Sequence, residues 1–176
     1  MLKLAPDYSD RIIVCTAPSK TFNLAGMQFS NIIIPNKEYQ EQWTEVVSNR
    51  LSVGMCSPFG LTAIIAAYTE GEEWLDQARA YIDGNIRYIE EFVKENLPKA
   101  VMMDCQGTYL VWLDLNEYCS DSEKLEALMV RKAGIIFDEG YIFGPEGSGF
   151  ERINAAAQRS TVEECMKRMK AALDTL

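Results

Sequence analysis

The stretch IIVCTAPSKTFNLAG, residues 12–26, carries the most information about the fold of this chain. Ile12–Cys15 is a short apolar run between the polar pair Asp10–Arg11 and Pro18, a pattern typical of a buried strand that leaves its sheet into a loop. Lys20 stands in that loop, and in α/β folds ligands bind where strands end in this way. An amine surrounded by apolar residues loses hydration, which favours the neutral form that bonds to carbonyl groups.

The composition is that of an ordinary globular protein. The chain has 176 residues, of which 48% are hydrophobic and 24% charged, and a chain of this length buries about 70% of the surface that it exposes when unfolded. The net charge of −9 argues against a nucleic-acid partner, because binding phosphates requires clustered Lys and Arg. No stretch approaches the roughly 18 apolar residues of a membrane-spanning helix, so we expect no membrane partner and a cytoplasmic location.

The residue types limit the chemistry that the chain can perform. It contains no histidine, which excludes Ser-His-Asp and Cys-His catalysis and a His-ligated metal. The cysteines are odd in number, widely spaced and without a C-x-x-C pair, which favours reduced thiols over a disulfide framework or a metal site: Cys15, Cys56, Cys105, Cys119 and Cys165. Among the remaining acids and bases, a lysine with reduced hydration is the best candidate for moving protons at neutral pH.

The first part of the chain predicts two further helices and a strand. Asn31–Ile34 is a second short apolar strand. Asn36 is a suitable N-cap for a helix whose apolar residues recur every three or four positions up to Leu51. A helix at Leu61–Tyr68 is apolar on all sides, so we expect it to be buried.

A long helix connects two predicted domains. An apolar stripe with helical spacing runs from Leu75 to Leu97 and ends at a proline. We place the domain boundary at its start, which gives a first domain of residues 1–71 and a second domain of residues 72–176. The second is expected to be a small α+β domain with three or four strands and helices on one side of the sheet.

The elements of the second domain are predicted from short signals. Two capping boxes, Ser120-x-x-Glu123 and Ser160-x-x-Glu163, open helices, and the first helix ends at Gly134. Four apolar runs predict strands: Val101–Met103, Tyr109–Leu113, Ile135–Phe137 and Phe150–Asn154.

Arg152 is the second candidate site residue. In a strand, Phe150, Arg152 and Asn154 lie on one face, where a guanidinium can bind a carboxylate through two parallel hydrogen bonds. A structural ion pair is the alternative, and for an Arg in a strand taken alone it is the more common case. The glycine-rich segment Gly144–Gly149 precedes a strand and contains an acidic residue, so a turn that shapes a substrate pocket is favoured over a phosphate loop.

The segment Ser19–Gly26 resembles the lysine segment of fold-type I enzymes that depend on pyridoxal 5′-phosphate (PLP). Within that family it is most similar to the aminotransferase class I/II group that includes the cystathionine β-lyase-like carbon–sulfur lyases. Further segments resemble the same group in the same order, so that the resemblance covers nearly the whole chain: Ser57–Gly60, Tyr68–Leu75, Gly107–Asp114, Gly147–Asn154 and Arg159–Ser160.

The resemblance implies roles for five residues. Lys20 matches the lysine that bonds to the cofactor, and Arg152 matches the arginine that binds the substrate carboxylate, with Asn154 beside it. Ser19 and Thr21 are expected to donate their hydroxyls to the cofactor phosphate or to cap the following helix, and the sequence leaves both readings open. No metal is implied.

The resemblance also implies that the matched part is the C-terminal portion of a longer enzyme. It implies an α/β fold in which residues 1–71 are the remnant of the large PLP-binding domain and residues 72–176 the small α+β domain. Family segments that hold the ring and the phosphate precede the lysine, whereas only nineteen residues precede Lys20, and a βαβ unit needs about 30. Ala17 and Gln28 replace a hydroxyl residue and an Arg that contact the phosphate in many relatives, and Gln158 replaces a proline.

Two functions are predicted from this resemblance. The first is a PLP-dependent enzyme that acts on an amino-acid substrate by transamination or by β-elimination of a carbon–sulfur bond, with the Lys20 segment closer to the lyases. The second is a non-catalytic fragment or interaction domain that retains the fold. For the isolated chain we expect weak or absent PLP binding, and a homodimer or other oligomer.

Overall fold

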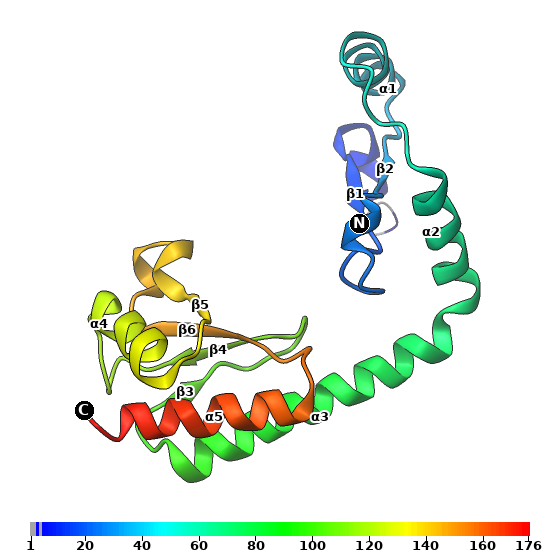
Figure 1. Cartoon of the computed structure of the whole chain (residues 1–176). Helices are drawn as coiled ribbons and strands as arrows, with labels where there is room; N and C mark the ends of the chain where they lie inside the picture. The colour runs from blue at the N-terminus through cyan, green and yellow to red at the C-terminus, as the bar shows by residue number, and fades with distance from the viewer. Residues whose placement is uncertain (1–2, 4) are drawn as a thin grey trace. The chain divides into compact units, whose positions relative to one another are not determined.

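The computed structural model of the chain describes residue 3 and residues 5–176. The chain divides into two compact units, Met1–Gln77 and Ala78–Leu176. Figure 1 labels the helices and strands of both. The mixture of helices and strands agrees with the predicted fold class. The domain boundary predicted at residues 71 and 72, with a large domain before it and a small domain after it, stays a prediction.

The strand before Lys20 is shorter and more exposed than predicted. Strand β1 (Val14–Thr16) pairs with strand β2 (Asn31–Ile33) in antiparallel orientation. The predicted strand began at Ile12 and was expected to be buried, but Cys15 and Thr16 are exposed. The prediction of burial was wrong because a two-stranded ribbon leaves much of its surface in contact with water.

Two helical segments follow β2. Helix α1 (Lys37–Trp43) continues directly into the π-helical segment η3 (Thr44–Arg50). Asn36 caps α1, as predicted, because its Oδ1 accepts hydrogen bonds from the backbone N–H groups of Glu38 at 2.9 Å and Tyr39 at 3.3 Å. The side-chain acceptor satisfies two of the amide groups that a helix start leaves without intrahelical partners.

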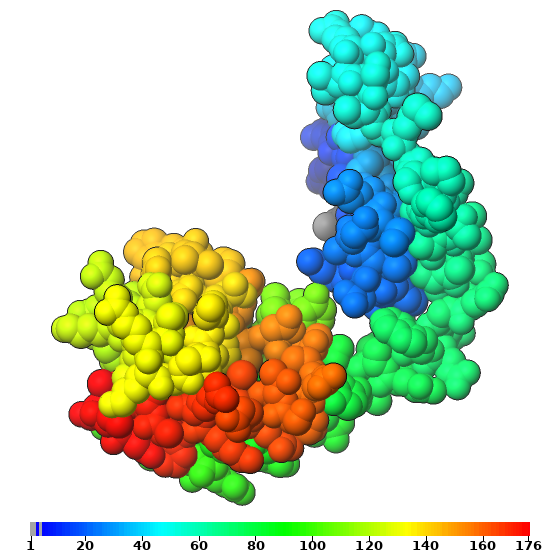
Figure 2. All heavy atoms as spheres, in the orientation of Figure 1, coloured from blue at the N-terminus to red at the C-terminus, as the bar shows by residue number. Residues whose placement is uncertain are grey.

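Helix α2 (Pro58–Glu70) forms where an apolar helix was predicted, but it is not buried. The Oγ atom of Ser57 accepts a hydrogen bond from the N–H of Gly60 and caps the helix. Only Gly60 and Ile64 are buried within α2, whereas Ile65 is 55% exposed. Figure 2 shows this helix at the surface of the first unit. An apolar helix is buried only where other elements cover each of its faces, and the first unit covers one side.

The second unit is built on a four-stranded antiparallel sheet in the order β3-β4-β6-β5. Its strands are β3 (Val101–Met102), β4 (Leu110–Asp114), β5 (Asp138–Glu139) and β6 (Phe150–Asn154). Its helical segments are α4 (Ser122–Ala127), η4 (Leu128–Ala133), η5 (Gly140–Phe143), η6 (Pro145–Gly147) and α5 (Arg159–Leu173). Helix α3 (Glu72–Asn96) begins in the first unit and continues into the second.

One face of the sheet carries the hydrophobic core of the second unit. Residues 111, 113, 151 and 153 of β4 and β6 point to this face and alternate with residues that are partly buried or, at Asn154, exposed. The helices contribute the rest of the core, whose buried members include Ile89, Val93, Leu97, Leu125, Met129, Val162, Met166, Met169 and Leu173. The sheet thus has four strands, within the predicted three or four, and the alternation in β6 leaves Arg152 on the face opposite the core.

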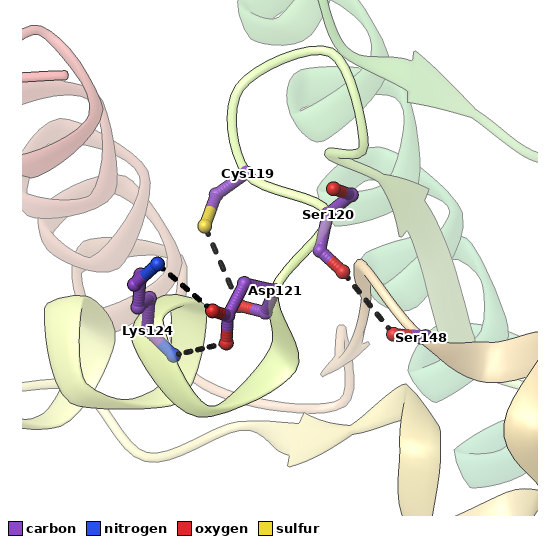
Figure 3. Close-up of polar contacts among 5 residues, drawn as sticks. All are labelled: Cys119, Ser120, Asp121, Lys124 and Ser148. Atoms are coloured by element: carbon purple, nitrogen blue, oxygen red, sulfur yellow. Dashed lines mark hydrogen bonds and ion pairs between the residues drawn. The ribbon is translucent and has the colours of Figure 1, made fainter.

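Both predicted capping boxes were wrong. Helix α4 is capped by Asp121, whose Oδ1 accepts a hydrogen bond from the N–H of Lys124, and the carbonyl of Ser120 instead accepts one from the hydroxyl of Ser148 (Figure 3). Asp121 stands directly before α4, so its side chain and not that of Ser120 is placed to accept from the amides of the first turn. Its carboxylate also forms an ion pair with the Lys124 amine at 3.0 Å. Helix α5 begins after Gln158, whose side chain makes no capping hydrogen bond.

The helical segments α4 and η4 end at Gly134 as predicted, but the strand predicted after them does not form. Gly134 ends η4 in a left-handed conformation with φ of 65°, which glycine adopts without strain. Residues 135–137 form no strand, and pairing begins only at Asp138. Ile135 packs into the core while Ile136 is 82% exposed, so the apolar run serves burial rather than sheet pairing.

A buried amide joins α3 to the segment that follows β6. Asn85 is fully buried, and its Nδ2 donates hydrogen bonds of 2.8 Å to the carbonyls of Ala155 and Ala157. The hydroxyl of Tyr81, one turn earlier, accepts a hydrogen bond from the N–H of Arg159 at the start of α5. These contacts fix the chain where it leaves the strand that carries Arg152.

Candidate functional site

Lys20 lies in a tight turn that follows β1. The turn is closed by a hydrogen bond from the N–H of Phe22 to the carbonyl of Pro18 at 2.9 Å, and by one from Leu24 to Ser19 at 3.0 Å. Pro18 is buried, whereas Lys20 is exposed. The loss of hydration expected from its apolar neighbours is therefore wrong for this chain, because the side chain of Lys20 stays in contact with water although Pro18 is buried.

Phe22 anchors the turn to the helices of the first unit. Its ring packs edge-on against Tyr68 of α2, with ring centres 5.8 Å apart, and stacks on Trp74 of α3 at 6.1 Å. Gly71, between the two helices, permits this approach, since a Cβ atom there would lie 2.8 Å from Cε1 of Phe22. These aromatic contacts fix the position of Phe22, which lies two residues after Lys20 in the turn.

Ser19 and Thr21 flank Lys20, and neither caps the next helix. The next helical segment is the 3-10 turn η2 (Ala25–Met27), whose cap residue is Leu24 and which has no side-chain cap. The capping role considered for the two hydroxyls was thus wrong. Their contact with a phosphate stays a prediction.

Arg152 lies near the middle of β6 and forms an ion pair. Its Nε and Nη2 atoms donate hydrogen bonds of 3.0 Å and 2.6 Å to the same oxygen, Oδ2 of Asp138 on β5. Its guanidinium carbon lies 4.3 Å from the centre of the Phe143 ring. The side chain is 22% exposed. The ion pair that the sequence offered as an alternative is therefore present, and carboxylate binding by Arg152 stays a prediction.

Asn154, at the end of β6, is exposed and engaged with its own backbone. Its Oδ1 accepts a hydrogen bond of 2.9 Å from the N–H of Ala156, which closes a short turn. Its amide nitrogen is directed away from that contact. The structure thus brings Asn154 and Arg152 together on one strand, and Lys20, Ser19 and Thr21 together in one turn of the other unit.

Aromatic side chains line a hollow on the face of the sheet that carries Arg152. A cavity of about 330 Å³ is lined by Met103, Trp112, Phe143, Glu146, Gly147 and Phe150. The Trp112 ring lies 5.2 Å from that of Phe143 and 6.4 Å from that of Phe150. The predicted turn at Gly144–Gly149 supplies two of the lining residues, as η6. These side chains make the hollow open and largely aromatic.

Glu151 is buried on the opposite face of β6. The residue is 1% exposed, and its Oε2 has no hydrogen-bond partner. Burial, with smaller contributions from the charges of Glu139 and Glu126, raises the pKa of Glu151 to about 8. The carboxyl group is therefore mostly protonated at neutral pH.

Sequence reasoning missed Asp138, Phe143 and Glu151. The alternation in β6 contained the signal for Glu151, because it places this acid on the same face as Ile153. Asp138 and Phe143 had no local signal, since Asp138 meets Arg152 through the pairing of β5 with β6, and Phe143 contacts it from η5.

Within residue 3 and residues 5–176, no three His, Cys, Asp or Glu side chains are grouped so that they could hold a metal ion. In the same part of the chain, no helix combines the length and apolar character needed to cross a membrane.

Comparison with curated proteins finds relatives over nearly the whole chain. Cystathionine β-lyase PatB of Bacillus subtilis is 39% identical over 170 residues, which are 97% of this chain and 44% of that protein. Protein MalY of Escherichia coli is 34% identical over 85% of this chain and 38% of its own length. No family model matches the chain.

A solved structure of a PLP-containing protein is also similar to this chain. Cystalysin from Treponema denticola, which contains a PLP cofactor, matches with a TM-score of 0.93 and 40% identity over 99% of this chain and 44% of that one. The chain belongs to the PLP-dependent family of carbon–sulfur lyases and aminotransferases. The predicted family and its cofactor are thereby confirmed.

The match covers part of each relative. A PLP-bound carbon–sulfur lyase from Staphylococcus hominis, with a TM-score of 0.87 and 36% identity, is likewise covered over 41% of its length. The chain spans less than half the length of the relatives that it matches, which is consistent with the predicted C-terminal portion.

The residues around Lys20 fit two ends of PLP. A primary amine is the group that bonds to the aldehyde, and the hydroxyls of Ser19 and Thr21 are suitable donors to a phosphate. All three side chains project from the same turn of residues 18–22. The donor set of this chain therefore matches the reactive and the phosphate ends of the cofactor.

Proposed function

We propose that the chain forms part of a PLP-dependent enzyme that acts on amino acids in the cytoplasm. The observation that carries this proposal is the Lys20 turn, in which an exposed amine stands between two hydroxyl residues, in a chain 39% identical to a cystathionine β-lyase over 97% of its residues. β-Elimination of a carbon–sulfur bond is favoured over transamination, because PatB is named for that activity and the identity with it is high.

Each site residue has a defined role in this proposal. PLP, when bound, supplies an aldehyde that bonds to amines and a ring that withdraws electrons from the substrate. Lys20 provides the amine for attachment and, once free, removes the proton from the substrate Cα. Arg152 binds the α-carboxylate through paired N–H donors, with Asn154 beside it. Ser19 and Thr21 donate to the phosphate.

A non-catalytic role is the second candidate, and one observation favours it. Lys20 is exposed, and neither β1 nor β2 buries both of its faces. A bond between an exposed amine and an aldehyde hydrolyses readily, so the chain taken alone is expected to hold PLP weakly.

Trapping with borohydride tests the proposed function. The purified chain is mixed with PLP, its visible absorption is recorded before and after reduction, and the labelled lysines are located by peptide mass spectrometry. We expect low total occupancy, with more label on Lys20 than on Lys37, an exposed lysine of the same unit that no flanking hydroxyls accompany. Equal labelling of the two lysines would remove the assignment of Lys20.

We also propose that the chain associates with itself through the exposed side of α2. Phe59 is 80% exposed, Ile65 55% and Tyr68 57%, and burying such side chains gains about 25 cal/mol for each Å² of apolar surface. Light scattering is expected to show a dimer or larger species. The variant Ile65→Glu should shift the population toward monomer, whereas Glu70→Gln, at the end of the same helix, should not. A monomer in the unaltered chain contradicts this expectation.

A further inference from the structure

Arg152 is held between two neighbouring strands. Its partner across the sheet is Trp112 on β4, and its partner on the other side is Asp138 on β5. Since directly paired residues point to the same face, all three side chains project from the face opposite the core. Arg152 is the central member of this row.

Asp138 occupies one edge of the guanidinium group. Both hydrogen bonds go to a single carboxylate oxygen, one from Nε and the other from Nη2. A guanidinium group is planar and carries its five N–H donors in a fixed fork. Two contacts on the Nε side therefore fix its rotation and direct the edge formed by Nη1 and Nη2 away from Asp138.

Phe143 covers one face of the same group. Its ring centre is 4.3 Å from the guanidinium carbon and its edge meets Trp112, so the ring is itself held in place. Phe143 ends η5, and Gly140 begins it. A Cβ atom on Gly140 would lie 2.2 Å from the carbonyl oxygen of Gly147, so only glycine permits η5 to pack this closely against η6.

We propose that Asp138 and Phe143 are positioning residues that fix the guanidinium plane of Arg152 and present its Nη1–Nη2 edge to a carboxylate. This inference rests on the proposed function, in which Arg152 binds the α-carboxylate of an amino acid. The pair of Arg152 and Asp138 has no net charge, so a ligand is selected by the geometry of the two free donors more than by long-range attraction. A carboxylate that binds in this way leaves the contact with Asp138 intact.

Side-chain NMR of the chain tests this arrangement without cofactor. In 15N-labelled protein, the Nε–Hε signal of Arg152 is assigned by its loss in Arg152→Lys, and sodium acetate is added with sodium chloride as the salt control. Acetate is expected to shift the Nη signals of Arg152 while its Nε–Hε signal stays in place. In Asp138→Ala, Nε–Hε should exchange rapidly with water and disappear.

Two further variants distinguish a positioning role of Asp138 from an effect of its charge. Asp138→Asn keeps an oxygen that can accept from Nε and should restore the Nε–Hε signal, whereas a role of charge alone would not be rescued. Glu146→Gln removes a negative charge from the lining of the neighbouring cavity and should leave the signal unchanged. Movement of Nε–Hε with acetate, an unaltered signal in Asp138→Ala, or no response of Nη to acetate overturns the inference. A failure of Lys20 to bind PLP would instead count against the proposed function, because this experiment contains no PLP.

Discussion

Replacing Glu151 with Gln is expected to remove a loss of stability that the unaltered chain suffers as the pH rises. The pKa of Glu151 is raised from 4.5 to about 8 in the folded chain, chiefly because the carboxyl group is buried. Between these two values the folded state keeps a proton that the unfolded state releases. The free energy of unfolding should therefore fall by about 1.4 kcal/mol for each pH unit in that window.

The sign of this effect follows from which form the fold prefers. Because the folded pKa is raised, the stabilisation is fully present below about pH 4.5 and is lost as the pH approaches 8. Summed over the window, the loss is about 4 to 5 kcal/mol, a large share of the 5–15 kcal/mol that stabilises a typical domain. Gln has the shape of the protonated acid and carries no ionisable group, so its profile should lack this slope.

Urea unfolding from pH 5 to pH 8, followed by the fluorescence of the tryptophans, measures the difference between the two profiles. The control is Glu139→Gln, since Glu139 faces Glu151 across β5 and β6 and its charge contributes to the raised pKa. That variant should make the slope shallower without abolishing it. Parallel profiles for the unaltered chain and Glu151→Gln contradict the burial argument.

Elements that depend on local spacing could be predicted from the sequence. The apolar stripe of α3 predicted a helix from Leu75 to Leu97, and the helix spans Glu72–Asn96. The alternation at Phe150–Asn154 predicted β6 with its observed bounds, and with Phe150, Arg152 and Asn154 on one face. Asn36 was predicted as a cap because the oxygen of a short amide side chain can accept hydrogen bonds from the free N–H groups of the first turn.

Elements that depend on distant partners could not be predicted in this way. The run Ile135–Phe137 has strand composition, but the pairing of β5 begins at Asp138 because β6 determines the register. The apolar composition of α2 predicted burial, and burial requires surfaces that the sequence of a helix does not specify. The ion pair of Asp138 with Arg152 joins residues 14 positions apart and follows from that register.

The same difference between local and distant determinants applies to the candidate site. Its residue types were predicted from the segments around Lys20 and Arg152, which are local. The exposure of Lys20 was not, because apolar neighbours in the sequence need not contact the amine in the fold. Phe22 is an example, since its ring packs against Tyr68 and Trp74.

Lys20→Ala is expected to abolish the borohydride-stable PLP label of the Lys20 turn. The covalent bond needs a primary amine, and neither neighbour can supply one, because Ser19 and Thr21 carry hydroxyls. The turn itself should survive the change, since it is closed by backbone hydrogen bonds and anchored by Phe22. Circular dichroism and tryptophan fluorescence should match those of the unaltered chain.

The matched control is Lys37→Ala, which removes an exposed lysine of the same unit at the start of α1. It should leave the label on Lys20 unchanged, whereas Ser19→Ala and Thr21→Ala should lower it if their hydroxyls hold the phosphate. In a longer protein that contains this chain, Lys20→Ala should also abolish turnover, because the same amine attaches the cofactor and moves the substrate proton. A label that persists in Lys20→Ala at the same site occupancy would show that another lysine holds PLP, and the role proposed for the turn would then be wrong.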